Sequence, residues 1–426
     1  MKSSQKKITL VWVIQPKRKI NYNQNNEANA AIEAISLARA LPFVKVSGSS
    51  LVSLEKIRPK EYFGSGKLKE LGEIFRLNKI DLVIINSQIS PIQQQNLEKK
   101  WKVKLLDRTA LILEIFSDRA VTKEGVLQVE MAALTYQRSR LVRAWTHLER
   151  QRGGLGFVGG PGETQIESDK RAIDHHLVRL KSQLVKIKKT RELHRMSRAK
   201  VPFPVIALVG YTNAGKSTLF NLLTGAKEFS ENMLFATLDP KMRALNLKNG
   251  LKIILSDTVG FISDLPTELI AAFRSTLEEV LAADLILHVR DISHDDTEIQ
   301  ALEVIKILQS LGISNSIPIL EIWNKMDILE PENQKSLKNI AKRKSEICLL
   351  SALTGEGIST LLDKVKTEIE PNKFCETLMV PFEFGEKKAW LYENGVVVSE
   401  LYTDTGFELD VMWSDQQKAI YCSINQ

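Results

Sequence analysis

The stretch Gly210-Tyr-Thr-Asn-Ala-Gly-Lys-Ser217 decides the fold of this 426-residue chain. It fits the pattern G-x-x-x-x-G-K-[ST] of a phosphate-binding loop, and it follows an apolar run over 205–209 that predicts a buried strand. Apolar residues three and four apart predict a helix from Lys216 to Leu223, with Gly225 as its stop. A chance match in a glycine-containing turn is the alternative, and the context of strand, loop and helix argues against it.

The residues of this loop suit the binding of a nucleotide. Gly210 and Gly215 permit backbone angles that a Cβ would resist, so successive N–H groups can face phosphates at the positive end of the helix. We predict that Lys216 contacts the β- and γ-phosphates and that Ser217 offers its hydroxyl to Mg²⁺. The predicted nucleotide contacts of the loop are Gly210, Tyr211, Thr212, Asn213, Ala214, Gly215, Lys216, Ser217 and Thr218.

Two stretches downstream are expected to sense the γ-phosphate. Asp257-Thr-Val-Gly260 ends a predicted strand, where the aspartate can hold Mg²⁺ through water and Gly260 can donate its N–H to the γ-phosphate. Thr237 lies between the loop and that strand, where a switch threonine would complete the metal shell when the triphosphate is bound. The predicted contacts here are Phe235, Ala236, Thr237, Leu238, Asp239, Asp257, Thr258, Val259 and Gly260.

Two more stretches are expected to select the base. Asp327, in Asn324-Lys-Met-Asp327, can accept hydrogen bonds from the N1–H and 2-amino groups of guanine, and adenine has no matching pair of donors. Ser351-Ala-Leu353 ends the next predicted strand and would offer a backbone N–H to the guanine oxygen. These contacts are Asn324, Lys325, Met326, Asp327, Ser351, Ala352 and Leu353. Each tetrapeptide alone is a weak signal, but five in order at strand ends indicate a GTPase of the translation-factor type.

The catalytic prediction follows from these assignments. We expect Lys216, Thr237, Asp257 and Gly260 to act in hydrolysis, with Ser217 and Thr237 as metal ligands. Phe261 stands where a Ras-like GTPase carries a water-orienting glutamine. An apolar side chain cannot orient water, so intrinsic GTP hydrolysis should be slow and should depend on a partner.

The whole chain has the composition of a soluble globular protein with two to three domains. Apolar residues make up 43% and charged residues 26%. No signal peptide and no run near eighteen apolar residues is found, so no transmembrane segment is expected. The cysteines are few, odd in number and without metal spacing: Cys348, Cys375 and Cys422. We expect a cytoplasmic protein, a monomer when free, and leave peripheral membrane association open.

Basic residues gather between Arg138 and Lys200. This span holds 16 Lys or Arg against six acidic residues, a net charge of +10, although the whole chain carries only +8. Such an excess fits a polyanion such as a phosphate backbone. A solvated helix face is the alternative from charge alone.

The predicted domains differ in their periodicity. Residues 1–110 alternate short apolar runs with helical stretches, which predicts a small parallel α/β subdomain. Within it, Phe63-Gly-Ser-Gly-Lys-Leu68 resembles a phosphate site, but a turn that leads into a helix is favoured because no strand precedes it. Residues 201–370 predict a doubly wound P-loop GTPase domain, and residues 371–426 a small α+β domain of unassigned role.

Residues 111–200 predict a basic antiparallel helical hairpin. Heptad spacing relates Ile173, Leu177, Leu180, Leu184 and Ile187, and a similar rhythm relates Leu134, Leu141, Trp145 and Leu148. Between the two helices, residues 151–162 include six glycines and cannot hold a helix. A long glycine-rich loop with arginines is more often functional than a plain connector, so rRNA contacts are predicted for Arg150, Arg152, Gly153, Gly154 and Phe157.

Four stretches together resemble the HflX family of GTPases. They are the glycine loop over 153–165, the segment Leu106-Asp-Arg-Thr-Ala-Leu-Ile-Leu-Glu-Ile-Phe116, the turn Phe63-Gly-Ser-Gly-Lys67 and the phosphate loop. The resemblance covers about residues 8 to 370, and Phe261 agrees with it. It implies a bacterial GTPase that binds the large ribosomal subunit and its rRNA, with GTP as substrate and Mg²⁺ as cofactor. It also implies splitting or rescue of stalled 70S ribosomes under stress, with hydrolysis stimulated by the ribosome.

Two other function classes remain as alternatives. A GTP-dependent ribosome-assembly or RNA-modification factor would need a further catalytic constellation, and the sequence shows no metal spacing and no convincing acid–base pair for one. His175 and His176 form the only histidine pair and are expected at the surface of a basic helix. An RNA-binding rod with an inactive nucleotide domain is disfavoured because Lys216, Ser217 and Asp257 are all present.

Overall fold

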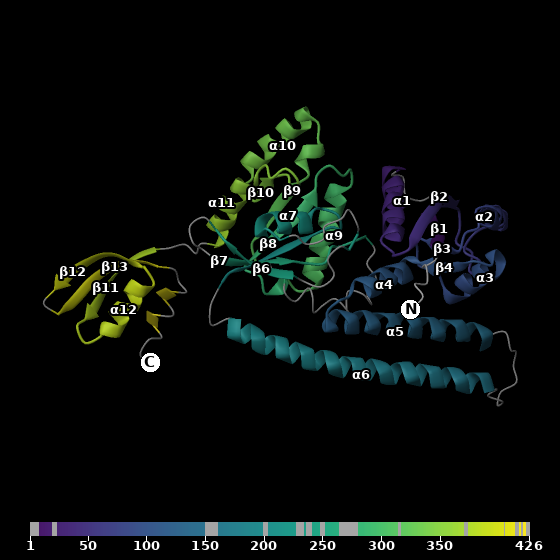
Figure 1. Ribbon diagram of the computed structural model, residues 1–426, viewed down its shortest axis with the longest axis horizontal. Helices are drawn as coiled ribbons and strands as arrows, with labels where there is room; N and C mark the ends of the chain where they lie inside the picture. Colours follow the sequence, from purple (N-terminus) through teal and green to yellow (C-terminus); the bar gives the residue numbers. More distant parts are fainter. Residues whose placement is uncertain are drawn as a thin grey trace, which may run out of the picture. The chain divides into compact units, whose positions relative to one another are not determined.

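The structure is a computed structural model (Figure 1). It describes residues 8–18, 24–149, 161–198, 203–226, 234–235, 241–247, 252–263, 280–313, 317–369, 374–403, 405–413, 417–418 and 421–422. The chain forms two compact units, residues 1–358 and residues 359–426. In the part of the chain that is described, no helix has the length and apolar character needed to cross a bilayer.

The N-terminal sheet is wholly parallel, with the strand order β2-β1-β3-β4. Its strands are β1 (Thr9–Arg18), β2 (Val44–Leu54), β3 (Leu82–Ile85) and β4 (Lys104–Asp107). The helices are α1 (Gln24–Arg39), α2 (Ser65–Leu77) and α3 (Pro91–Trp101). The predicted parallel α/β unit is therefore confirmed. Gly64 precedes α2, so the turn at 63–68 does lead into a helix.

Local sequence explains where α3 begins. The Ser90 hydroxyl accepts a hydrogen bond from the Gln93 N–H, the Gln93 side chain accepts one from the Ser90 N–H, and Pro91 occupies the first turn. At the other end, the Trp101 ring packs against Phe75 with its centroid 5.1 Å away, and its indole N–H donates to the Leu68 carbonyl at 3.0 Å. The aromatic pair fastens α3 to α2 over this side of the sheet.

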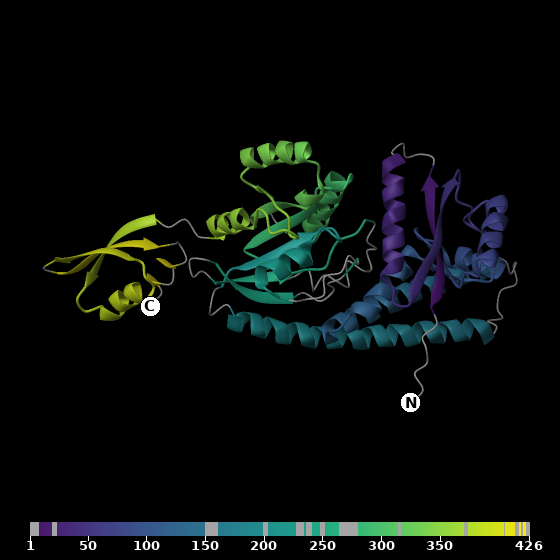
Figure 2. The same cartoon turned by 45° about the horizontal axis from the view of Figure 1, so that its top comes forward.

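The middle of the chain is helical, as predicted. Helix α4 (Arg108–Arg119) begins at Asp107, whose carboxylate accepts from the Ala110 N–H at 2.8 Å. Two long helices follow and run side by side in Figures 1 and 2: α5 (Lys123–Glu149) and α6 (Pro161–Arg198). Arg138 pairs with Asp174 at 2.6 Å across them. We call α5 and α6 the basic rod.

The heptad positions of α6 face inward in the basic rod. Leu177 and Leu180 are buried, and Ile173, Leu184 and Ile187 are half-buried, whereas Val178 and Val185 are about two-thirds exposed. His175 and His176 are exposed, as expected for a surface pair. Leu134 and Leu141 of α5 are half-buried, and the side chains of Trp145 and Leu148 lie outside the described residues.

The GTPase sheet has six strands in the order β10-β9-β8-β5-β7-β6, and only β6 runs antiparallel to its neighbour. Its strands are β5 (Val205–Gly210), β6 (Lys241–Asn246), β7 (Lys252–Asp257), β8 (Leu285–Asp291), β9 (Ile319–Asn324) and β10 (Ile347–Leu349). Described helical segments are α7 (Lys216–Thr224), α9 (Thr297–Ser310), η1 (Met326–Ile328) and α10 (Pro331–Arg343). The chain order reverses beside β5, which is where a doubly wound sheet binds its ligand.

The second unit contains α11 (Ile358–Ile369), which begins at its boundary, and an antiparallel sheet of order β11-β13-β12. The sheet consists of β11 (Phe374–Pro381), β12 (Val397–Thr403) and β13 (Gly406–Trp413), with α12 (Gly385–Glu393) packed on it. Leu409, Val411 and Trp413 are fully buried, as their alternation predicts. The expected strand at 418–421 is wrong, because Lys418 and Tyr421 are helical and β11 pairs with β13 instead.

The seam of the basic rod can be tested by truncating Leu180. Leu180→Ala should lower the free energy of unfolding of the rod by about 2–5 kcal/mol, since it removes a side chain that is 3% exposed. Amide hydrogen exchange of α5 and α6 would measure the loss. Val185→Ala on the same helix, where the side chain is 66% exposed, should change it by only about 0.5 kcal/mol. Equal effects would contradict the packing.

Candidate functional site

The phosphate loop joins β5 to α7 through two glycines that the backbone requires. Gly210 has φ +151°, and a Cβ there would lie 2.1 Å from the Val289 carbonyl oxygen of the neighbouring strand. Gly215 has φ +96° and directly precedes α7. The first turn of α7 therefore presents its free N–H groups next to the loop, as an anion site needs.

Lys216 and Ser217 stand at the start of α7 and face the end of β7. The Lys216 ammonium is buried and donates to the carbonyls of Gly210 at 3.0 Å and Tyr211 at 2.7 Å. The Ser217 hydroxyl donates to Asp257 Oδ2 at 2.8 Å. The structure thus brings three predicted site residues together, and Thr218 follows them half-buried on α7.

Gly260 closes the site from the other side. A Cβ on Gly260 would lie 2.8 Å from Thr212 Cγ2 and 2.9 Å from Lys216 Nζ, so no larger residue fits here. Thr258, two residues earlier, is anchored by donating to the Leu208 carbonyl at 2.6 Å. Phe261 is 3% exposed, and its backbone pairs with the loop, with its N–H donating to Gly210 and its carbonyl accepting from Thr212. Its ring is part of the core and offers no polar group.

Asn324 ties the base-selecting stretches to the phosphate loop. Its buried side-chain amide donates to the Ala214 carbonyl at 2.8 Å and accepts from the Ala352 N–H at 2.9 Å. A Cβ on Gly215 would lie 2.1 Å from Asn324 Nδ2, so the glycine makes room for this amide. Three stretches that are far apart in the sequence therefore meet at one side chain.

The predicted base contacts differ in exposure. Asp327 and Leu353 are exposed, while Met326, Ser351 and Ala352 are buried. Lys325 has φ +65° and pairs with Asp291 at 2.6 Å. An exposed carboxylate beside a buried backbone frame is suited to meet a base that arrives from solvent.

Some predicted residues cannot be placed. Ala236, Thr237, Leu238 and Asp239 lie outside the described residues, as do Arg150, Arg152, Gly153, Gly154 and Phe157. Phe235 is described and 2% exposed, and its ring packs edge-on against Phe116 of α4 at 4.6 Å between centroids. The predicted switch stretch thus contacts the helical region at its first residue.

Burial sets the charge states in the GTPase core. It lowers the pKa of Lys216 to about 8, against an opposing effect of Asp257, and it lowers the pKa of His288 on β8 to about 4. A phosphate next to Lys216 favours the charged ammonium and so raises that pKa. His288 is neutral at pH 7, and it stabilises the fold less as pH falls from about 6.5 towards 4 because the unfolded chain then binds the proton first.

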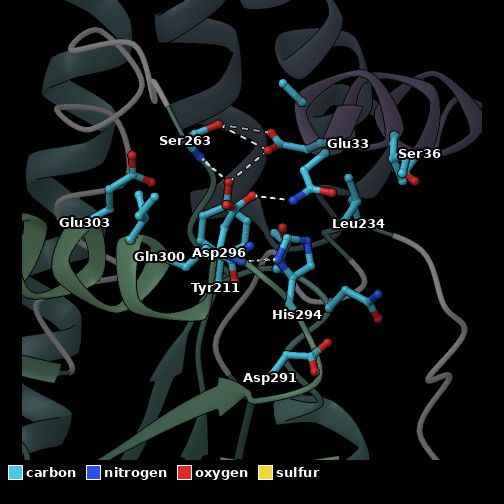
Figure 3. Close-up of a pocket in the computed structure, with 16 residues that line it drawn as sticks. Glu33, Ser36, Tyr211, Leu234, Ser263, Asp291, His294, Asp296, Gln300 and Glu303 are labelled. Atoms are coloured by element: carbon cyan, nitrogen blue, oxygen red, sulfur yellow. Dashed lines mark hydrogen bonds between the residues drawn. The ribbon is translucent and has the colours of Figure 1, made fainter. Parts of the chain in front are cut away.

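The N-terminal sheet contributes a glutamate to this region that the sequence did not reveal. Glu33 of α1 accepts from the Tyr211 hydroxyl at 2.9 Å and from the Ser263 hydroxyl at 3.1 Å (Figure 3). The Ser263 N–H in turn donates to the Tyr211 oxygen at 2.6 Å. One carboxylate from residues 24–39 therefore binds both the phosphate loop and the segment that follows Gly260.

Arg108 completes the network around Glu33. Its Nη2 lies 2.5 Å from Glu33 Oε1 and 2.7 Å from the Ser263 carbonyl, and its Nη1 donates to Asn86 at 2.6 Å. The side chain is 8% exposed, so its charge is neutralised inside the network. A cavity of about 300 Å³ lies beside these groups, lined by Asn29, Ala30, Ile32, Glu33, Ser36, Tyr211, Thr212, Asn213, Leu234, Ser263, Asp291, His294, Asp296, Ile299, Gln300 and Glu303.

The oxygen atoms near Lys216 suit a hard cation. Ser217 Oγ and Asp257 Oδ2 are 2.8 Å apart, and hydroxyl and carboxylate oxygens are what Mg²⁺ prefers. Nowhere in the described ranges do three or more His, Cys, Asp or Glu residues gather as a metal site. A metal at this place would therefore depend on the nucleotide phosphates for several of its ligands.

The geometry defines a P-loop GTPase, and comparisons with known proteins agree. Family descriptions match along most of the chain: GTP-binding GTPase N-terminal (29–117), GTP-binding GTPase Middle Region (119–198), 50S ribosome-binding GTPase (205–325) and HflX C-terminal domain (336–420). The crystal structure of the SsGBP and GDP complex is 27% identical with a TM-score of 0.50, and the match covers 84% of this chain and 97% of that one.

Curated relatives carry the same family name. GTPase HflX of Magnetococcus marinus is 47% identical over 355 residues, which are 83% of this chain and 81% of the relative. GTPase HflX of Escherichia coli is 40% identical over 348 residues, 82% of this chain and 81% of the relative. The chain therefore belongs to the HflX family of GTPases, as its motifs predict.

The Glu33 network can be tested with a double-mutant cycle. Glu33→Ala and Tyr211→Phe each break the same hydrogen bond, so their effects on the unfolding midpoint should be less than additive. A coupling free energy of about 1–3 kcal/mol is expected for a bond to a charged group. Tyr62→Phe removes a hydroxyl that donates to Ser87 at 2.8 Å and should add to Glu33→Ala without coupling. Additivity of the first pair would refute the bond.

Proposed function

We propose that this GTPase is Mg²⁺-dependent, binds the large ribosomal subunit and splits or rescues stalled 70S ribosomes under stress. The observation that carries the nucleotide part is the meeting of the phosphate loop, Asn324 and Ala352 at one buried amide. The ribosomal part is supported by the family description as a 50S ribosome-binding GTPase and by the charge of the basic rod.

In this proposal each residue at the phosphate end has one role. Lys216 neutralises the β- and γ-phosphates, and the Gly260 N–H meets the γ-phosphate. Ser217 and Thr237 hold Mg²⁺, with Asp257 binding through water. Mg²⁺ would neutralise charge that develops on the phosphate oxygens. Lys216 already lies in a water-poor place, where its charge acts strongly on phosphate oxygens.

At the base end, Asp327 supplies selectivity. Its carboxylate is exposed and accepts from guanine N1–H and the 2-amino group, while the Ser351-Ala-Leu353 segment donates to the guanine oxygen. The Asn324 bridge sets the distance between this carboxylate and the phosphate loop. A nucleotide is then measured at both ends by a single rigid frame.

The basic rod provides the surface for rRNA. Its α6 carries exposed cationic side chains along its length: Arg171, Arg179, Lys181, Lys186 and Lys189. Phosphate contacts of this kind give strong, salt-dependent affinity with little sequence preference. Residues 151–162, with Arg150 and Arg152 before and in that stretch and Phe157 within it, are proposed to reach functional rRNA, where an aromatic ring can stack on an unpaired base.

A ribosome-assembly or RNA-modification factor is the second candidate. It would share GTP binding and the basic rod, but it would act on an isolated subunit or on a base. Sedimentation of 70S ribosomes with the protein and GTP, a non-hydrolysable analogue or GDP separates the two functions. Nucleotide-dependent formation of free subunits supports splitting, and binding to 50S subunits with intact 70S particles supports assembly.

Asp327→Asn tests base selection. The variant should lose GTP affinity by about 100-fold or more, because two hydrogen bonds to a charged group are lost, and it should gain affinity for xanthosine triphosphate. Calorimetry with both nucleotides would measure the switch. Glu332→Gln, an exposed acid on α10 outside the site, should leave both affinities unchanged. Full GTP selectivity in Asp327→Asn would count against the role.

Replacing Gly153–Gly162 by a short Gly-Ser turn tests the tip of the basic rod. Slow intrinsic GTP hydrolysis should persist, because the nucleotide site is untouched. Ribosome binding should weaken less than splitting, since the exposed cations of α6 still contact rRNA. Splitting is measured by sedimentation at matched ribosome occupancy. If the shortened protein separates subunits as well as the parent, residues 153–162 are only a connector.

A further inference from the structure

The Thr212 hydroxyl is buried without a partner. The residue is 6% exposed, and among the described residues no group lies within hydrogen-bonding distance of its Oγ1. Buried side-chain hydroxyls almost always have a partner in folded proteins, and an exception calls for an explanation such as a ligand or a catalytic role. Thr212 is also the second residue after Gly210 in the phosphate loop, so a ligand explanation is at hand.

The Thr212 side chain lies where the loop, Gly260 and Lys216 meet. Its Cγ2 would be 2.8 Å from a Cβ on Gly260, and Lys216 Nζ would be 2.9 Å from the same point. The Thr212 N–H donates to the Phe261 carbonyl at 2.7 Å, which fixes the backbone that carries the hydroxyl. Because Lys216 and Gly260 are the groups proposed above to contact the γ-phosphate, this inference rests on that proposed placement.

Neighbouring polar groups are already engaged. The Tyr211 and Ser263 hydroxyls both donate to Glu33, and Arg108 binds Glu33 and the Ser263 carbonyl (Figure 3). Phe261 supplies no polar atom from its side chain. On this side of the loop, the Thr212 hydroxyl therefore still has its hydrogen-bonding capacity to offer, and it lines the cavity beside these groups.

We propose that Thr212 is a catalytic residue of GTP hydrolysis, whose hydroxyl binds the attacking water and a γ-phosphate oxygen in the transition state. A hydroxyl has one donor and two acceptor positions, so it can donate to the phosphate and accept from the water at once. It thus supplies the orientation that Phe261 cannot.

The reaction balances without a proton transfer to Thr212. The water oxygen forms the new bond to the γ-phosphorus, and the bond from phosphorus to the β,γ-bridging oxygen breaks. The electron pair of that bond leaves with GDP. The water proton stays with the released inorganic phosphate, so Thr212 acts by hydrogen bonding and orientation alone.

The test compares Thr212→Val, Thr212→Ala and Thr212→Ser in the full chain. Single-turnover hydrolysis at saturating GTP and Mg²⁺ measures the chemical step, and calorimetry measures the affinities for GDP and GTP. Val and Ala should each lower the hydrolysis rate by about tenfold or more, as expected for loss of one transition-state hydrogen bond. Thr212→Ser, which keeps the hydroxyl, should retain a rate near that of the parent.

A structural role predicts different readouts. Val keeps the size and branching of Thr, so GDP affinity should stay within about twofold, and the thermal midpoint of the nucleotide-free protein should not fall because no hydrogen bond is lost. A parental rate in Thr212→Val and Thr212→Ala would overturn the proposal. So would a lower midpoint with lower GDP affinity in Thr212→Val that Thr212→Ser fails to restore.

Lys216→Ala distinguishes this failure from failure of the proposed site. It should abolish GTP binding, because the cation at the phosphates is lost. If Lys216→Ala binds GTP like the parent, the γ-phosphate does not lie here, and both the placement and the role of Thr212 are wrong. If it loses binding while Thr212→Val hydrolyses normally, only the role of Thr212 is wrong.

Discussion

The GTPase region depends on the two hydrogen bonds of the Asn324 side chain. A buried amide that lost either partner would leave an unsatisfied polar group, at a cost of about 1–3 kcal/mol. Its bonds to Ala214 and Ala352 therefore hold the phosphate loop and the base-selecting segment at one separation. Gly215 is required for the same reason, since any Cβ would displace the amide. Phosphate binding and base selection are thus parts of a single packed unit.

The parts of the fold that rest on local pattern could be predicted from the sequence. Buried parallel strands are continuous apolar runs, and β3 and α3 have the bounds that these runs and the Ser90-Pro91 start indicate. The spacing of leucines in α6 predicted which side chains face α5. The motif residues at strand ends could be assigned because the carboxyl ends of parallel strands meet at one edge of a sheet. In each case a short stretch contained the whole signal.

Contacts between distant stretches could not be predicted in this way. Glu33 and Tyr211 are 178 residues apart, and Arg108 and Ser263 are 155 apart, so no periodicity relates them. Glu33 reads as an ordinary acid in an amphipathic helix, and only the packing of α1 gives it these partners. Strand β11 was missed because its alternation places Glu376, Leu378 and Val380 on one face, a pattern that mixes charge with apolar residues. Thr212 carries no signal in sequence either, since its hydroxyl is distinguished by the partner it lacks.

The Glu33 carboxylate also has a thermodynamic consequence for the N-terminal sheet. It bonds at the same time to the phosphate loop and to the segment after Gly260, so the position of α1 and the conformation around the nucleotide are linked equilibria. Linkage is reciprocal, so any molecule that binds the N-terminal sheet and shifts α1 changes nucleotide affinity by the same factor by which the nucleotide changes the affinity for that molecule. A surface more than a hundred residues upstream in the chain is in this sense an allosteric input to the GTPase.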